Sequence, residues 1–151
     1  MRALAAALAL LFGTLGLAAD EPPLPEVAAA LSRIASRSTV ELTTTGRKSG
    51  QPHSRPIWFV ISDGEVIVQA GKDGKTDWYQ NLMKTPAVTL RQGEYTFRAR
   101  AVPVKDPARV EAIHKLFLDK YTTAWLLSWF GSRIGRGMPV EMALQSVSVA
   151  R

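Results

Sequence analysis

The sequence predicts an α+β fold: a small split or closed β-barrel of about six mostly antiparallel strands, with short helices at its periphery. Segments rich in β-branched and aromatic residues recur through the centre of the 151-residue chain. Most of them are separated by short turns that contain glycine, and short turns join antiparallel neighbours. Helical patterns are few and short, so we place the helices around the barrel.

The composition is that of one globular domain, with 46% hydrophobic and 21% charged residues. The net charge of +6 indicates an anionic partner, such as a phosphorylated cofactor, or simply a basic surface. The chain has no long run of Lys and Arg, so we expect no nucleic acid partner. It also has no cysteine, and His53 and His114 are isolated, so we expect neither a disulfide nor a metal site.

The beginning of the chain has the layout of a secretory signal peptide. Met1-Arg2 is followed by an almost wholly apolar stretch up to Leu17 and then by Ala18-Ala19. This apolar stretch is shorter than the ~20 residues that a transmembrane helix needs. We therefore expect a signal peptide over residues 1–19, Sec export to the periplasm or beyond, and no stable membrane insertion after cleavage. An uncleaved N-terminal anchor is the alternative.

A linker and a helix are expected next. Residues 20–25 are rich in proline and predict a stiff linker, ahead of a single domain over 26–151. Three apolar residues recur at helical spacing over 26–37 and would share one helix face. These residues are Val27, Leu31 and Ile34.

The strands are predicted from β-branched runs and from the turns between them. Asp63-Gly64 is a strong signal for a tight hairpin. Residues 57–61 are apolar on both strand faces, which predicts burial on both sides. We expect strands over residues 40–45, 54–62, 65–70, 87–91, 94–104 and 140–149.

Two further helices are predicted from their starting residues. Thr76 or Asp77 can cap a short helix over 78–84. Asp106-Pro107 combines a cap with a proline that suits a first helical turn, which predicts a helix over 106–121.

The turn at residues 46–50 is the sharpest local feature of the sequence. Its two glycines bracket Arg47, Lys48 and Ser49, so exposed backbone amides, two cations and a hydroxyl lie within five residues. Such a group can hold a phosphate, although a basic hairpin turn can also be merely soluble. Lys72 lies in a second polar loop and would extend this anion site if the two loops meet.

Aromatic residues near these loops could support a planar ring. Trp78 and Tyr79 stand at the start of the predicted helix over 78–84, and a helix N-terminus favours anions. Trp58 lies in the middle of a strand and could form the wall of a flat cofactor site. Core packing is the alternative interpretation for all three side chains.

Taken together, these motifs resemble a known family. The stretch LTTTGRKSGQPHSRPIWFV over residues 42–60, then Gly71-Lys72, and then WYQNL over 78–82 is similar to the deazaflavin (F420)-dependent nitroreductase family. That family belongs to the split β-barrel superfamily that also holds FMN-binding, pyridoxamine-phosphate-oxidase-like proteins. The resemblance covers roughly residues 40–104.

The resemblance implies a cofactor, F420 or FMN, and a homodimer. It also implies that the basic turn holds the phosphate or acidic tail of the cofactor, while later residues frame its ring. Three positions depart from the family pattern: His53 replaces a frequent basic residue, Gly71 replaces a serine, and only Tyr121 remains of a tyrosine-rich segment. The implied cofactor contacts are Arg47, Lys48, Ser49, His53, Trp58, Gly71, Lys72, Trp78 and Asn81.

The expected function is an exported oxidoreductase that transfers hydride to a quinone, a nitro compound or a similar small acceptor. Hydride transfer is the chemistry of the cofactor itself, so no catalytic side chain is singled out. Two alternatives remain open at this point. One is a non-catalytic periplasmic binding module for flavin, haem or an apolar ligand, and the other is a structural dimer with no ligand.

Overall fold

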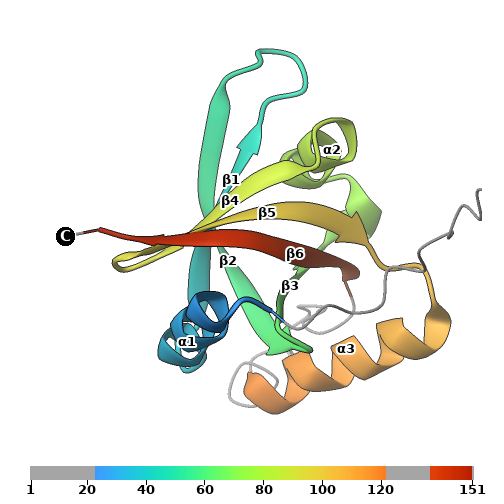
Figure 1. The fold of residues 1–151 in the computed structure, drawn as a ribbon. Helices are drawn as coiled ribbons and strands as arrows, with labels where there is room; N and C mark the ends of the chain where they lie inside the picture. Colours follow the sequence, from blue (N-terminus) through green and yellow to red (C-terminus); the bar gives the residue numbers. More distant parts are fainter. Residues whose placement is uncertain (1–22, 122–136, 151) are drawn as a thin grey trace, which may run out of the picture.

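A computed structural model describes residues 23–121 and 137–150 as a closed six-stranded barrel (Figure 1). The strands follow the order β1-β2-β3-β6-β5-β4, and every neighbouring pair is antiparallel. The predicted fold class is thus confirmed, while the expected signal peptide and the first half of the linker, residues 20–22, lie outside the described residues. The strands are β1 (Thr39–Thr45), β2 (Pro52–Ser62), β3 (Glu65–Ala70), β4 (Ala87–Gln92), β5 (Tyr95–Pro103) and β6 (Met138–Val149).

Three α-helices surround this barrel (Figure 1). The first, α1 (Pro25–Ile34), contacts β6, and the second, α2 (Asp77–Lys84), contacts β1. The third, α3 (Pro107–Lys120), lies against β2 and β6, and a short 3₁₀ turn (Lys72–Gly74) precedes α2. In Figure 1, α2 lies beside the β1–β2 hairpin, whereas α1 and α3 lie near the opposite end of the barrel.

Most element boundaries differ from the sequence predictions by only a few residues. β2 begins at Pro52, earlier than expected, because the ladder with β1 continues to the pair Thr45–Pro52 although these residues are exposed or half-buried. The hairpin at Asp63-Gly64 is confirmed, since both residues have positive φ angles, 54° and 75°, as a type I′ turn requires. The cap of α3 is confirmed as well: Asp106 accepts a hydrogen bond of 2.8 Å from the backbone N–H of Arg109.

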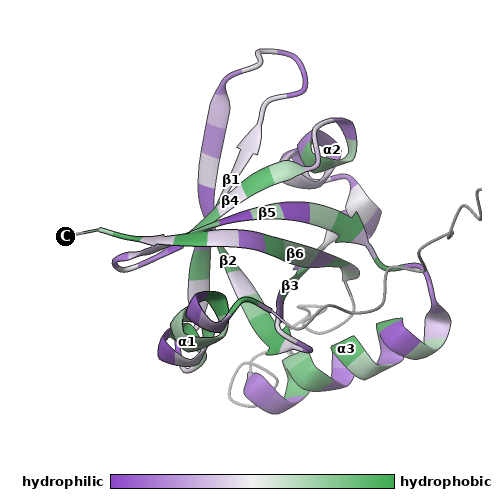
Figure 2. Cartoon of the chain, viewed as in Figure 1, coloured by the Kyte–Doolittle hydropathy of each residue, from purple (hydrophilic) through white to green (hydrophobic). Residues whose placement is uncertain are grey.

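Buried and outward-facing residues alternate along the strands, and the buried ones form the core (Figure 2). On β1, Val40, Leu42 and Thr44 are buried, while the residues between them are half-buried on the outer face. Phe59 and Phe97 are fully buried among them. The apolar face of α1 covers this core, and the residues predicted for that face are all buried: Val27, Leu31 and Ile34.

An ion-pair cluster fastens α3 to the barrel. The Arg109 guanidinium lies 2.7 Å from Glu141 on β6 and 2.9 Å from Asp63 in the β2–β3 turn. The hydrogen bond with Glu141 raises the pKa of Arg109, and Ser62 together with Arg109 lowers the pKa of Asp63. Because Arg109 contacts both β6 and the β2–β3 turn, it fixes the position of α3 along the barrel wall.

Trp58 corrects the prediction that residues 57–61 are buried on both sides. Phe59 and Val60 are buried, but Trp58 is 38% exposed. Its indole stacks on the Tyr121 ring at the end of α3, with ring centroids 4.8 Å apart and planes 9° apart. The prediction failed because Thr39, opposite Trp58, is the first residue of β1, and a single aromatic ring rather than a whole element packs on Trp58 there.

Tyr121 completes the hydrogen bonding of β2 at the point where β1 begins. Its hydroxyl accepts from the backbone N–H of Phe59 at 3.0 Å and lies 2.7 Å from the carbonyl oxygens of Phe59 and Ser38. Burial raises the pKa of this phenol, so it stays a neutral donor. The hydroxyl thus serves backbone groups that a longer β1 would otherwise pair.

Lys120, next to Tyr121, yields a prediction about pH. Its Nζ donates to the carbonyl of Phe59 at 2.9 Å and lies 3.8 Å from the centre of the Phe59 ring. Burial lowers the pKa of this ammonium from 10.5 to about 8. Between these two values the unfolded state binds more protons than the folded state, so the contribution of Lys120 to stability rises with pH.

We therefore expect the free energy of unfolding of the wild type to rise between about pH 8 and pH 10 relative to that of Lys120→Met. Denaturant unfolding across this range measures both proteins, and all other groups titrate in both. An identical pH dependence in the two proteins would contradict the assignment.

Candidate functional site

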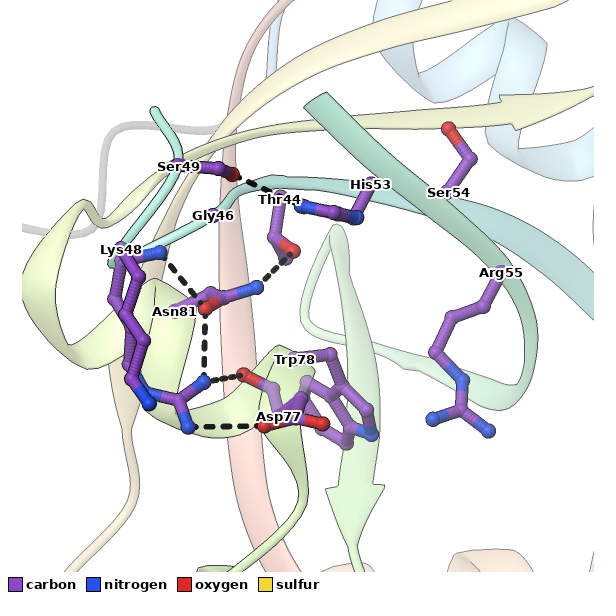
Figure 3. Close-up of a pocket in the computed structure, with 11 residues that line it drawn as sticks. Thr44, Gly46, Lys48, Ser49, His53, Ser54, Arg55, Asp77, Trp78 and Asn81 are labelled. Atoms are coloured by element: carbon purple, nitrogen blue, oxygen red, sulfur yellow. Dashed lines mark hydrogen bonds and ion pairs between the residues drawn. The ribbon is translucent and has the colours of Figure 1, made fainter. Parts of the chain in front are cut away.

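A cleft of about 440 Å³ lies between the β1–β2 turn and α2 (Figure 3). Residues of the β1–β2 hairpin form one wall, and the first turns of α2 form the other. Six of the nine predicted cofactor contacts line this cleft: Arg47, Lys48, Ser49, His53, Trp78 and Asn81. The remaining lining residues are Thr44, Gly46, Ser54, Arg55 and Asp77.

The glycines of the basic turn are required by its geometry. The N–H of Gly46 donates to Gln51 and the N–H of Gly50 donates to Gly46, both at 2.8 Å, which closes the turn. Gly50 has a φ of 70°, which side chains rarely adopt. A Cβ on Gly46 would lie 2.7 Å from the Nε2 of His53, closer than van der Waals contact permits.

Gly46→Ala is accordingly expected to displace the side chains of Ser49 and His53. Overpacking of this kind costs about 1–2 kcal/mol of unfolding free energy, and it narrows the cleft. Thermal unfolding and cofactor titration would measure the two effects. The matched control is Gly71→Ala, because a Cβ on Gly71 meets no atom within 4 Å. If the two variants unfolded at the same temperature and bound the cofactor equally well, Gly46 would not be required for the shape of the turn.

Asn81 connects the three parts of the site. Its side-chain oxygen accepts from the backbone N–H of Arg47 at 3.0 Å and from the Arg47 guanidinium at 3.2 Å. Its amide nitrogen lies 3.3 Å from the Thr44 hydroxyl. Asn81 is only 5% exposed, so its hydrogen bonds are shielded from water. One buried amide therefore holds β1, the turn and α2 in register.

The Arg47 guanidinium is occupied by protein partners. It lies 2.9 Å from the Asp77 carboxylate at the start of α2, in addition to its bond with Asn81. The Nζ of Lys84, in the last turn of α2, donates to the Arg47 carbonyl at 2.7 Å. These contacts tie the turn to α2, so Arg47 acts chiefly as a positioning residue.

Two other cations of the cleft are free within the part of the chain that the structure describes. Neither Lys48 nor Arg55 has a hydrogen bond or ion pair with any residue of 23–121 or 137–150, and both side chains are exposed. Figure 3 shows the Trp78 indole between them. Trp78 is only 5% exposed and packs mainly in the core, as the alternative interpretation expects, so a ligand in this cleft would meet an edge of its indole with a positive charge on either side.

Ser49 and His53 form a second contact within the cleft. The Ser49 hydroxyl lies 3.2 Å from the Nε2 of His53 and accepts from the backbone N–H of Gln51, also at 3.2 Å. His53 thus supports the turn from the neighbouring strand.

The other three predicted contacts lie elsewhere. Trp58 stacks on Tyr121 and does not line the cleft. Gly71 and Lys72, at the start of the 3₁₀ turn, also lie outside the lining, so the loop over 71–75 does not join the basic turn in one anion site. The N-terminal turns of α2 form the second wall instead.

Arg55 is the cation among the five lining residues that were not predicted as cofactor contacts. The signal for it is the two-residue period of a strand, because Arg55 shares a strand face with His53. Applied to β2, that rule would have placed Arg55 in the site together with His53.

The residues of the cleft fit a planar, phosphorylated cofactor. The volume lies within the ~300–1,000 Å³ range of small-molecule sites. Lys48 provides a positive charge and an N–H donor group for a phosphate, while the N–H groups of Gly46, Arg47 and Gly50 already donate within the protein. Trp78, 5% exposed, is anchored in the core and gives the cleft a rigid apolar edge beside which a ring can lie.

Comparison with known proteins identifies the family of the chain. A profile of the F420H(2)-dependent quinone reductase family matches residues 27–144. An F420H(2)-dependent quinone reductase of Mycobacterium tuberculosis is 29% identical over 107 residues, which are 66% of this chain and 68% of that protein.

Solved structures show the same fold. An F420-H2-dependent reductase has a TM-score of 0.53 and 26% identity, and the match covers 72% of this chain and 95% of that one. A pyridoxamine 5′-phosphate oxidase-like protein of Listeria innocua has a TM-score of 0.59 and 13% identity, over 82% and 97% of the two chains. The fold is thus a split barrel of the pyridoxamine-phosphate-oxidase kind. The protein is an oxidoreductase with F420 as its cofactor, and it belongs to the F420H(2)-dependent quinone reductase family.

Proposed function

We propose that this protein transfers hydride from reduced F420 to a quinone or a similar small acceptor. The reduced deazaflavin supplies the hydride, and the acceptor takes up that hydride and a proton to become a quinol. The observation that carries the proposal is the cleft itself, where Lys48, unpaired within residues 23–121 and 137–150, the glycine-bracketed turn and the edge of a buried indole line one space. Family membership favours this reductase over a non-catalytic binding module.

Each residue of the cleft has a defined task under this proposal. Lys48 binds the phosphate, while Arg47 and Asn81 hold the turn against α2. Trp78 supports the ring. The protein binds and orients the cofactor and leaves one ring face open to the acceptor, so no acid–base pair is required.

Turnover tests the reaction directly. Reduced F420 is mixed with the purified domain and a soluble quinone, and the return of oxidised F420 absorbance is followed. We expect oxidation that depends on both protein and quinone. Binding of F420 without any oxidation by quinones or nitro compounds would favour the binding module, and substitution of FMN for F420 tests the choice of cofactor.

Among substitutions that change a single surface charge, we expect Lys48→Glu to weaken F420 binding most. Lys48→Glu replaces an exposed cation with an anion beside the phosphate, so we expect F420 affinity to fall at least tenfold, roughly the strength of one charge-assisted hydrogen bond. Fluorescence quenching measures the dissociation constant. Lys115→Glu, an equal charge change on the exposed face of α3, is the control and should bind as the wild type does. Equal affinity of Lys48→Glu and the control would remove Lys48 from the site.

We also propose that the protein is exported after cleavage of residues 1–19. The support is the sequence pattern of the first residues. Among the helices of residues 23–121 and 137–150, none combines the length and the apolar character needed to cross a bilayer. N-terminal sequencing of protein from the periplasmic fraction tests export; full-length chains retained in the cytoplasm would contradict it.

A homodimer is the third part of the proposal. Within the described residues, Pro52–Trp58 of β2 pair with β1 only, whereas β3 pairs with Phe59–Ser62. This leaves an exposed strand edge beside the cleft, and such edges favour pairing with another chain. Light scattering of the purified domain should give the mass of two chains, and the mass of one chain would contradict it.

A further inference from the structure

The cleft holds one more cation than the binding of a single phosphate uses. Lys48 lies on the turn, and Arg55 lies on β2 beyond the Trp78 indole (Figure 3). Both are free of partners within the described ranges, whereas Arg47 is held by Asp77 and Asn81. An elongated ligand that places its phosphate at Lys48 and extends along the cleft past the edge of Trp78 therefore has its far end near Arg55.

The two candidate cofactors differ in charge at that far end. The F420 chromophore carries a phenol-like hydroxyl, and ionisation of this group spreads a negative charge over the ring. The flavin of FMN carries a methyl group in its place and has no such charge. An arginine beside the ring would therefore favour the deazaflavin, because a planar guanidinium both stacks on rings and donates to anionic oxygens.

We propose that Arg55 is a specificity-determining residue that selects the anionic deazaflavin chromophore over the neutral flavin chromophore. This inference rests on the proposed function, since it assumes that the Lys48 turn takes the phosphate. The other basic groups of the cleft are committed elsewhere. Arg47 is ion-paired, and His53 lies against the Ser49 hydroxyl at 3.2 Å.

Four ligands separate the role of Arg55 from that of Lys48: F420, its chromophore without the phosphate tail, FMN and riboflavin. Fluorescence titration gives the dissociation constant of each with the wild type, Arg55→Gln and Lys48→Gln. We expect Arg55→Gln to weaken both deazaflavins about tenfold and to leave FMN and riboflavin within about twofold. Lys48→Gln should weaken the two phosphorylated ligands and leave the two tail-less ones unchanged.

Two further variants serve as controls. Arg55→Lys retains the charge and should restore a large part of the affinity for the tail-less deazaflavin. Arg100→Gln removes an exposed arginine on β5 outside the cleft and should have no effect on any ligand. If Arg100→Gln weakened deazaflavin binding as much as Arg55→Gln, the loss of affinity would reflect the net charge of the protein, and the proposal would be overturned.

The outcomes also separate this inference from the proposed function. If the wild type binds F420 and Arg55→Gln leaves the tail-less deazaflavin unaffected, the inference fails and the proposed function stands. If the wild type binds F420 but not the tail-less deazaflavin, contacts with the tail account for the binding affinity, and the inference fails as well. If folded wild type binds no deazaflavin at all, the proposed function fails with it.

Discussion

Tyr121→Ala is expected to lower the free energy of unfolding by about 4 kcal/mol, because it removes ring packing and a hydrogen-bonding hydroxyl at the same place. The ring is 8% exposed and stacks on both Trp58 and Phe117. The hydroxyl serves the buried backbone groups of Phe59. Both losses fall next to Thr39, where β1 begins and its pairing with β2 stops.

Tyr121→Phe separates the two contributions. The ring stays and only the hydroxyl is lost, so we expect a loss of about 1–2 kcal/mol, the cost of leaving a buried N–H without a partner. Denaturant unfolding measures both variants. Because Tyr121 does not line the cleft, F420 affinity of Tyr121→Phe should equal that of the wild type. Weaker binding would show that Tyr121 contacts the cofactor after all.

Asn81→Leu is expected to lower the free energy of unfolding by about 2–4 kcal/mol and to weaken F420 binding at least tenfold. The substitution leaves the backbone N–H of Arg47 and part of its guanidinium without an acceptor in a partly buried position. The basic turn then loses its fixed position relative to α2, and the phosphate donors lose their alignment.

Asn81→Asp distinguishes positioning from charge. The carboxylate still accepts from Arg47, and the Thr44 hydroxyl can donate to it, so we expect a folded protein close to wild-type stability. The added negative charge faces the cleft and repels the phosphate, so F420 affinity should nevertheless fall about tenfold. Denaturant unfolding and F420 titration of Asn81→Leu and Asn81→Asp measure the two effects. If Asn81→Leu matches the wild type in both measurements, Asn81 does not organise the site.

The sequence predicted the parts of the fold that depend on neighbouring residues. The alternation of β1, the Asp63-Gly64 turn and the Asp106 cap are each encoded within a few residues. The environment of Trp58 is different, because it depends on where β1 stops and on Tyr121, far along the chain. No local pattern contains that information.

The same distinction applies to the candidate site. The motif around Lys48 identified one wall of the cleft because the turn is continuous in sequence. The opposite wall required knowing that α2, rather than the loop containing Lys72, packs against the turn. That choice is made by the ion pair of Arg47 with Asp77 and by the buried amide of Asn81, which act only after the chain has folded.

The most direct test is a titration of the domain from Asp20 onward with F420 and with FMN, followed by fluorescence quenching, for the wild type and Lys48→Glu. We predict tight binding of F420 by the wild type, weaker binding of FMN, and a loss of at least tenfold in F420 affinity for Lys48→Glu. A folded wild-type protein that binds neither cofactor would contradict the proposed cofactor site, and so would equal F420 affinity of the two proteins.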